Sequence, residues 1–310
     1  MNAIEIQSLR KDYGHGRIGV EDITLEVPSG TIVGFIGPNG AGKTTTIRVL
    51  LGLLAPTSGS ARLFGHDVRT DGPRARAGIG YVPGETNLYP SMKVGDLLAY
   101  LAKFHPGDHR ARRRELVELF ELDLDATTTD LSVGNKKKVA IVAALEPAPR
   151  LVILDEPTSG LDPIVRARLF DRLRDEVARG TTVFFSSHAL GEVEATCERV
   201  AIVNRGRVVA YDDVAALRRR AMRRVHATFA EGGTGGDALT GLASRRLDGV
   251  ESLERHGTSI TFLYRGPIPP LLDALAAASP TDVRIEEASL EDVFLADFAP
   301  ERTGAHHHVA

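Results

Sequence analysis

The nine residues GPNGAGKTT, Gly37–Thr45, constrain this chain more than any other stretch. They follow the apolar run TIVGFIG at 31–37 and precede TTIRVLLGLL at 45–54, a segment with the composition of a helix. Continuous apolarity indicates a strand that is buried on both faces of a parallel sheet. Between a strand and a helix, the pattern Gly-x-x-x-x-Gly-Lys-Thr predicts a nucleotide-binding P-loop rather than a glycine-rich turn with a chance lysine.

In such a loop, glycines let backbone amides approach phosphates closely, and the helix that follows directs its positive end at the anion. Lys43 is expected to reach the β and γ phosphates as a catalytic group, and the Thr44 hydroxyl is expected to bind Mg²⁺. The predicted ATP-binding residues of the loop are Gly37, Pro38, Asn39, Gly40, Ala41, Gly42, Lys43, Thr44 and Thr45.

Two carboxylates follow a second apolar run, in LVILDEPTSGLD at 151–162. Ligands bind at the carboxyl ends of the strands in open α/β sheets, so Asp155 is a predicted Mg²⁺ ligand and Glu156 the predicted catalytic base. His188 ends a third run, TTVFFSSH at 181–188, and is predicted to contact the γ-phosphate. Without a P-loop upstream, the simpler interpretation would be that Asp155 and Glu156 are solvated acids and that His188 has a structural role.

The segment between these last two runs has the signals of one helix. Asp162 is a candidate N-cap, Pro163 fits the first helical position, and Gly180 stands just past the end. Strand, helix and strand in this order form a crossover unit of a parallel α/β sheet. The 310 residues exceed what one core usually buries, so we expect an ATP-binding domain at 1–217, a smaller α+β domain at 218–300 and a disordered tail at 301–310.

Taken in order, the P-loop, LSVGN at 131–135, LVILDEPTSGLD and FFSSH resemble the ATP-binding subunit of an ABC transporter, over roughly residues 3–215. The resemblance implies an α/β P-loop NTPase fold of ABC type, with a RecA-like core and helical and antiparallel β subdomains. It implies ATP and Mg²⁺ as cofactors, Tyr13 stacked on the adenine, and Asp162 at a dimer interface. Ser132, Val133, Gly134 and Asn135 would clamp the γ-phosphate bound by a second copy.

Two departures from the family pattern stand out. Val133 and Asn135 replace the glycine and glutamine of the usual Leu-Ser-Gly-Gly-Gln. Gly84 stands where the family usually places a glutamine that touches Mg²⁺ and the attacking water, and Glu85 follows it. Either Glu85 substitutes or coupling proceeds without this ligand. The lysines at 136–138 fall in the first turn of the next helix, which predicts that they are available to the same anion.

The nearest subgroup resembles bacterial drug and antibiotic exporters of the daunorubicin-resistance and tetronasin-resistance kind. SLEDVFL, Ser289–Leu295, is similar to their C-terminal motif. Ser289 and Asp292 also form a capping box, so a plain helix start is the alternative. The role of the histidines at 306–308 stays open.

A net charge of −3, and basic runs without interleaved aromatics, predict that nucleic acid is not a partner. The single cysteine, Cys197, fits a reducing compartment. No 18 apolar residues run together, so a separate membrane permease is the expected partner, with the chain on the cytoplasmic face of the membrane. Two other functions stay open: a nucleotide-gated module with negligible hydrolysis, and the ATPase subunit of an importer.

Overall fold

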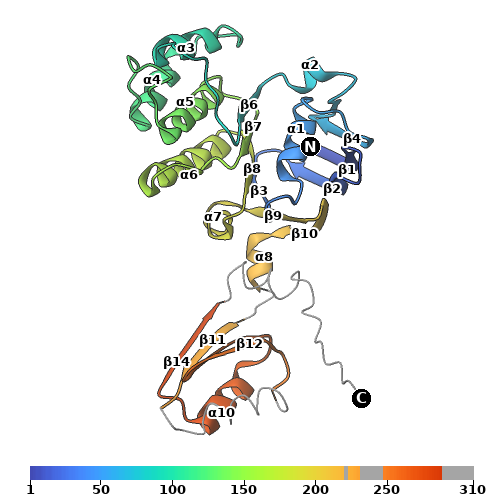
Figure 1. Cartoon of the computed structure of the whole chain (residues 1–310), viewed down its shortest axis with the longest axis vertical. Helices are drawn as coiled ribbons and strands as arrows, with labels where there is room; N and C mark the ends of the chain where they lie inside the picture. The colour runs from blue at the N-terminus through green and yellow to red at the C-terminus, as the bar shows by residue number, and fades with distance from the viewer. Residues whose placement is uncertain (220–222, 231–246, 288–310) are drawn as a thin grey trace. The chain divides into compact units, whose positions relative to one another are not determined.

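The computed structural model describes residues 1–219, 223–230 and 247–287. The chain divides into two compact units, Met1–Asp213 and Val214–Ala310 (Figure 1). Each unit has its own sheet and its own buried apolar core. None of the helices in the described ranges combines the length and apolar character that crossing a bilayer requires.

The first unit is built on a ten-stranded sheet in the order β5-β4-β1-β2-β10-β9-β3-β8-β7-β6. Its strands are β1 (Asn2–Asp12), β2 (Ile18–Pro28), β3 (Ile32–Ile36), β4 (Ser58–Leu63), β5 (His66–Asp67), β6 (Ile79–Val82), β7 (Leu151–Asp155), β8 (Thr182–Ser187), β9 (Arg199–Asn204) and β10 (Arg207–Asp213). The strands from β9 to β6 in that order are parallel, whereas β5, β4, β1 and β2 pair antiparallel. The sheet therefore joins a parallel core to an antiparallel β lobe.

The three apolar runs of the sequence form β3, β7 and β8, and every residue of these strands is buried. They lie next to one another, with Ile36 paired to Ser187 and Asp155 paired to Ser186. By contrast, β2 alternates buried and exposed positions, as a strand with one solvated face does. The parallel α/β core is thus confirmed, and its three central strands end at a common edge.

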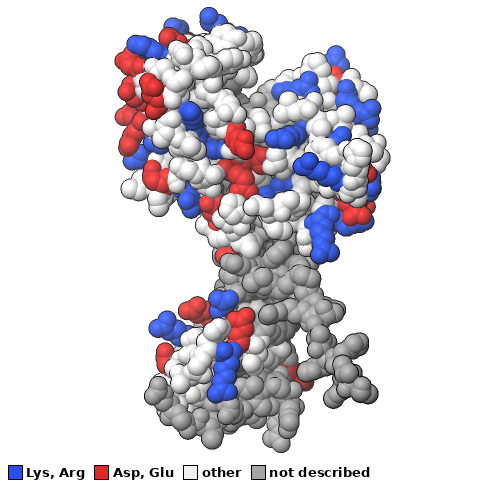
Figure 2. Space-filling view, in the orientation of Figure 1, with Lys and Arg blue, Asp and Glu red and all other residues white. Residues whose placement is uncertain are grey.

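Seven helices are described in the first unit: α1 (Lys43–Leu50), α2 (Gly72–Ala75), α3 (Val94–Ala102), α4 (Arg110–Leu119), α5 (Val133–Leu145), α6 (Pro163–Ala178) and α7 (Leu190–Thr196). Of these, α3, α4 and α5 gather in a helical lobe beside β6 (Figure 1). On the face drawn in Figure 2, the basic side chains of this unit lie in separate groups among acidic and uncharged ones.

Helix α6 begins and ends where the sequence predicts. The Asp162 carboxylate accepts hydrogen bonds from the Ile164 and Val165 amides, at 3.0 and 2.9 Å, and Gly180 follows the helix with φ 98°. The backbone amide of Val165 contributes most to lowering the pKa of the Asp162 carboxyl. The apolar stripe of the helix is not buried along its whole length, since Val177 is only half-buried and Glu176 is buried instead.

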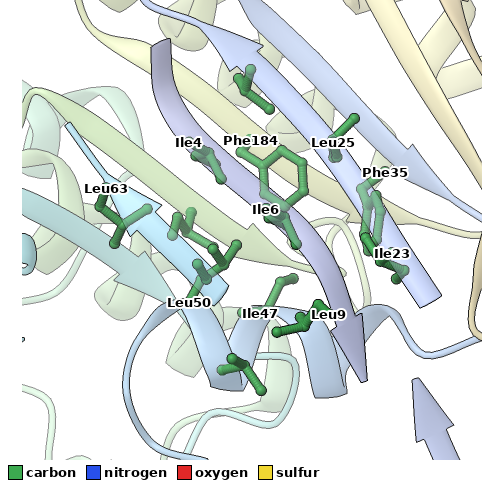
Figure 3. Packing of buried hydrophobic residues seen from close by; sticks show 14 of the residues in the cluster. Ile4, Ile6, Leu9, Ile23, Leu25, Phe35, Ile47, Leu50, Leu63 and Phe184 are labelled. Carbon is green, nitrogen blue, oxygen red and sulfur yellow. The ribbon is translucent and has the colours of Figure 1, made fainter. Parts of the chain in front are cut away.

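The apolar core of the first unit holds α1 against the sheet. Figure 3 shows Ile47 and Leu50 of α1 gathered with side chains from β1, β2 and β4. Phe35 and Phe184, from adjacent central strands, belong to the same cluster, with ring centroids 5.1 Å apart. Burial of large apolar side chains is the main stabilising term in such a core. It also fixes the start of α1, and with it the loop that precedes the helix.

A cluster of charged residues, three of them buried, joins the helical lobe to α6. Glu176 is 2% exposed and pairs with Arg112 of α4 and, at 2.7 Å, with Arg172 of its own helix. Arg172 also pairs with Glu115, so α4 and α6 share several ionic contacts. The members of this ionic cluster are Arg112, Arg113, Glu115, Glu146, Arg172 and Glu176. It is a polar contact between elements that an apolar stripe alone would not have predicted.

The second unit has a four-stranded antiparallel sheet in the order β12-β13-β11-β14. Its described elements are α8 (Val214–Arg219), β11 (Arg223–Thr228), β12 (Val250–His256), β13 (Ser259–Tyr264), α10 (Ile268–Ala278) and β14 (Asp282–Glu287). Leu271 and Leu275 of α10 share a core with Phe262 and Tyr264 of β13. The SLEDVFL stretch at 289–295 and the tail at 301–310 lie outside the described residues.

We expect Glu176→Gln to destabilise the first unit by about 3–5 kcal/mol, because the buried guanidinium of Arg172 and the partly buried one of Arg112 lose a shared carboxylate. Urea unfolding of the full chain measures the change. The control is Asp171→Asn on the same helix, where a solvent-exposed pair with Arg174 is lost and the change should stay below about 1 kcal/mol. Equal effects of the two substitutions would contradict a stabilising role for the ionic cluster.

Candidate active site

The loop at 37–42 connects β3 to α1 along a path that two of its glycines make possible. Gly40 and Gly42 have φ values of 80° and 105°, in the left-handed region that side chains disfavour. Gly37 is constrained differently: a Cβ there would lie 2.1 Å from the Val203 carbonyl oxygen of β9. Gly37 is therefore required for close packing against the sheet, and not only for approach to a phosphate.

The N-terminus of α1 is an open anion site. Gly42 is its N-cap, no side chain caps the helix, and its first turn contains no acidic residue. The first amides of a helix have no intrahelical acceptor, and the helix dipole adds partial positive charge there. The loop and the start of α1 therefore offer several N–H donors at one point, which is the chemistry that binds phosphate.

Lys43 brings a formal charge to the same point, although its side chain is only 6% exposed. Its ammonium donates to the Gly37 carbonyl at 2.6 Å and lies 3.4 Å from Oε1 of Glu156. These contacts hold the ammonium between the phosphate loop and the end of β7. Lys43 and the predicted base Glu156 thus form an ion pair within the site.

The groups predicted to hold Mg²⁺ also come together. The Thr44 hydroxyl donates to Oδ1 of Asp155 at 3.3 Å, and Asp155 is buried at the end of β7. The Ser186 hydroxyl of β8 donates to the same Oδ1 at 2.6 Å and accepts the Glu156 amide at 3.0 Å. A hydroxyl beside a carboxylate gives the hard oxygen ligands that Mg²⁺ prefers, so these residues fit the ion.

Glu156 has a distinctive backbone, with φ 47° in a region that non-glycine residues rarely adopt. Its two carboxylate oxygens have different partners: Oε2 contacts Nδ1 of His188 at 2.8 Å, and Oε1 faces the ammonium of Lys43. His188 is 66% exposed, so the pair is open to solvent on one side. A carboxylate fixed in this way can orient a water molecule and accept its proton.

Glu192 of α7 was not predicted from the sequence, yet it connects two of the motifs and helix α6. Its Oε2 accepts hydrogen bonds from the hydroxyls of Thr158 and Ser187, both at 3.0 Å, and its Oε1 pairs with Arg166 at 3.3 Å. Thr158 follows Glu156 by two residues, and Ser187 precedes His188. Glu192 therefore holds the segments that carry Glu156 and His188 in register.

Tyr13 lies at the other end of the hollow that the loop lines. Its hydroxyl contacts the Thr45 hydroxyl at 3.3 Å, and its ring is flanked by Lys11 and Arg17, at 5.3 and 5.4 Å from the centroid. The side chain is 42% exposed, so part of the ring is accessible to solvent. Two further basic residues that the sequence analysis did not select, Arg17 and Arg48, line the same hollow.

The segment Ser132–Asn135 lies at the start of α5, and none of its residues lines the hollow that holds Lys43. Ser132 caps the helix by accepting the Asn135 amide at 3.2 Å, and Val133 is 70% exposed. A Cβ at Gly134 would lie 2.5 Å from the Gly160 carbonyl oxygen, so this glycine permits α5 to touch the loop before Asp162. The structure thus separates this segment from the chain's own phosphate loop.

Gly84 lies directly beside the site, since a Cβ at this position would be 3.4 Å from Oδ2 of Asp155. Of the three lysines at 136–138, Lys137 differs from its predicted placement. Lys137 is only 1% exposed and donates to the carbonyl oxygens of Pro83 and Gly84, at 2.8 and 2.7 Å. It is therefore not available at the surface to an anion in front of α5, because its ammonium is turned toward the loop after β6.

Comparisons with known proteins agree with this geometry. The family model described as ABC transporter matches residues 20–159. The chain is similar to Nod factor export ATP-binding protein I of Cupriavidus metallidurans, at 34% identity over 297 residues, which cover 94% of this chain and 96% of the relative.

Two solved structures share the fold. One, described as the ATP-binding subunit of an ABC transporter, superposes with a TM-score of 0.66 at 31% identity and covers 70% of this chain and 92% of its own. The other, a dimeric ATP-binding cassette bound to ADP and Pi, has a TM-score of 0.62 at 23% identity and covers 68% of this chain and 98% of its own.

We expect Glu156→Gln to lower kcat for ATP hydrolysis by at least about a hundredfold, because the amide cannot accept the proton of the attacking water. ATP binding should persist, since the loop at 37–45 is unchanged. A phosphate-release assay measures kcat, and titration with a fluorescent ATP analogue measures binding. The control is Glu198→Gln, which alters an exposed acid away from the site. Unchanged turnover in Glu156→Gln would overturn the role of Glu156.

Proposed function

Because the chain belongs to the ABC transporter family of ATP-binding proteins and is an ATPase of that family, we propose that it powers export through a separate membrane permease. The observation that carries the proposal is the assembled site, in which Lys43, Thr44, Asp155, Glu156 and His188 meet at one edge of the sheet. A site with these contacts intact argues against a module that only senses nucleotide.

Hydrolysis requires positioning and charge neutralisation rather than a covalent intermediate. The loop amides and Lys43 bind and neutralise the phosphates. Thr44 and Asp155 would hold Mg²⁺, which supplies further positive charge to the phosphate oxygens when bound. Glu156 orients the attacking water and accepts its proton, while His188 fixes the Glu156 carboxylate through the contact at 2.8 Å. The exposed part of the Tyr13 ring would stack on the adenine.

The second part of the proposal is that two copies pair head to tail, with Ser132–Asn135 of each clamping the nucleotide of the other. The start of α5 is exposed, is free of acidic residues in its first turn, and lies away from the chain's own loop. A related cassette is described as dimeric with ADP and Pi bound, which supports the arrangement. Asp162, at the start of α6, is the proposed neighbour of that interface.

We expect Ser132→Asp to abolish ATP-driven dimerisation of the Glu156→Gln chain. Asp is as good an N-cap as Ser, so α5 should remain folded, but its carboxylate repels the partner's γ-phosphate. Light scattering with and without Mg-ATP measures the dimer. The control is Ser29→Asp, which alters an exposed residue in the turn between β2 and β3. A Ser132→Asp chain that still dimerises with ATP would contradict the trans clamp.

The proposed permease contact is an aromatic patch on the helical lobe, formed by Tyr89, Tyr100 and Phe104. These rings are 58%, 40% and 67% exposed and pack edge to face, with centroids 6.1 and 5.3 Å apart. Phe104 also lines a hollow with residues of β6 and with Pro147. Exposed apolar surface of this kind marks interaction sites, and it lies on the segment that follows the loop at 83–85. A short amphipathic segment of a membrane protein fits this surface.

Export rather than import is supported by relatives that are named as export ATP-binding proteins. We further propose drugs or antibiotics as the exported compounds, on the similarity of SLEDVFL at 289–295 to the C-terminal motif of such exporters. The proposed location is the cytoplasmic face of the membrane, held there by the permease. Neighbouring reading frames test the direction: a lone polytopic membrane protein agrees with export, and a substrate-binding protein agrees with import.

We expect the chain to copurify with the membrane protein of an adjacent gene, and candidate drugs to stimulate the ATPase activity of that complex. Tyr100→Ser combined with Phe104→Ser should abolish copurification, because the apolar contact is lost while both positions are already solvated in the free chain. The control is Leu53→Ser, another exposed apolar residue, at 67% exposure. If the doubly substituted chain still copurifies, the permease does not bind at the aromatic patch.

A further inference from the structure

The most unusual charge in the first unit is that of Lys137, which lies one turn into α5. Its side chain is 1% exposed, and the hydrogen bonds of its ammonium go to two backbone carbonyls, those of Pro83 and Gly84. An ammonium held only by neutral acceptors recovers little of its lost hydration, so burial in this form is costly. Burial indeed lowers the pKa of Lys137. The cost calls for a reason beyond packing.

The surroundings of Lys137 supply that reason. Apart from burial, the groups that act on its charge are the carboxylates of Asp155 and Glu156, which oppose the lowering of its pKa. Gly84, whose carbonyl Lys137 holds, lies with its Cα beside Asp155. The ammonium therefore holds the loop at 83–84 at the point where that loop borders the predicted Mg²⁺ ligand. The same short loop thus contacts a positive group and lies beside a negative one.

The simpler alternative is that Lys137 only fastens the loop at 83–84 to α5, as a structural clip, and has no effect on catalysis. A glutamine or asparagine amide has two N–H donors and could hold the same two carbonyls without burying a charge. Gly84 has no side chain with which to reach the site itself. A cation brought from α5 supplies instead a positive field directed at Asp155 and Glu156, together with a fixed position for the loop. These two effects together account for a buried ammonium better than the clip alone.

We propose that Lys137 is a positioning residue for ATP hydrolysis, which fixes the loop at 83–84 against Asp155 from the helix that begins with Ser132–Asn135. One step rests on the proposed function, namely that Ser132–Asn135 acts on the nucleotide of a second copy. Granted that step, α5 faces two nucleotides: its N-terminus faces the partner's, and Lys137 faces its own. Movement of α5 on closure then changes the geometry of the chain's own site.

The test compares Lys137→Met, Lys137→Gln and a control, Lys93→Met, in the full chain with Mg-ATP. Met keeps the length and apolar stem of the lysine but removes every donor, whereas Gln returns two donors without the charge. Lys93 also donates a hydrogen bond, to Asp125 at 2.9 Å, but both side chains are exposed. Three quantities are measured for each: kcat and KM, binding of a fluorescent ATP analogue, and the thermal midpoint.

We expect Lys137→Met to lower kcat at least tenfold while KM and analogue binding change less than threefold. Its thermal midpoint should change little, because relief of the buried charge offsets the loss of the two hydrogen bonds to the loop. Lys137→Gln should recover part of the lost kcat, and Lys93→Met should match the parent chain. A split of kcat from KM with retained stability is a result that a merely structural clip would not produce.

Two results would overturn the inference. One is a kcat for Lys137→Met within twofold of the parent. The other is a fall in kcat that is matched by lost ATP binding or a lowered thermal midpoint. Failure of the trans clamp is distinguishable, since Glu156→Gln would then stay monomeric with ATP. In that case a tenfold fall in kcat would retain Lys137 as a positioning residue for its own site and remove only the link between copies.

Discussion

The parallel pairing of β3, β8 and β7 is the constraint on which the rest of the first unit depends. Its register sets Ile36 opposite Ser187 and Ser186 opposite Asp155, so the three strands end within a residue of one another. The chain leaves each strand with a different reactive segment: the phosphate loop, Glu156 and His188. Because side chains alternate along a strand, a shift of one residue would turn Asp155 away from Thr44. The hydrogen bond from Ser186 to Asp155 fixes that register where it matters.

The sequence predicts those parts of this arrangement that depend on local pattern. Continuous apolarity identifies the central strands, the spacing of glycines and Lys43 identifies the loop, and Asp162 with Pro163 identifies the start of α6. Ser186 and Glu192 escape such an analysis because their roles come from pairing between distant segments. The sequence does contain one signal for Ser186, because two serines follow the apolar residues of this strand just before His188. A polar residue at the end of a buried strand needs a partner, and here the partner is Asp155.

Runs of charged residues also show that a local sequence pattern does not reveal which side chains are buried. A run of lysines in a helix is usually solvated, and nothing in its spacing distinguishes Lys137 from its two neighbours. Tertiary packing makes the distinction, since one helical position faces the loop at 83–84 while the adjacent ones are half-buried. Likewise, Glu176 is buried in its pair with Arg112 although it belongs to a helix with many exposed charges. Burial of a charge depends on the partner element, and the partner is set by the fold.

The departures from the family pattern leave the contacts within the site intact. Val133 is exposed, and Asn135 takes part in the cap of α5 through its backbone N–H, which donates to Ser132. Neither replacement therefore disturbs the start of α5. Gly134, the position that does pack tightly, keeps its glycine against Gly160. At Gly84 the missing side chain lets backbone lie beside Asp155. The two motifs that depart from the pattern are thus joined through α5, which begins after Ser132 and contacts Gly84 through Lys137.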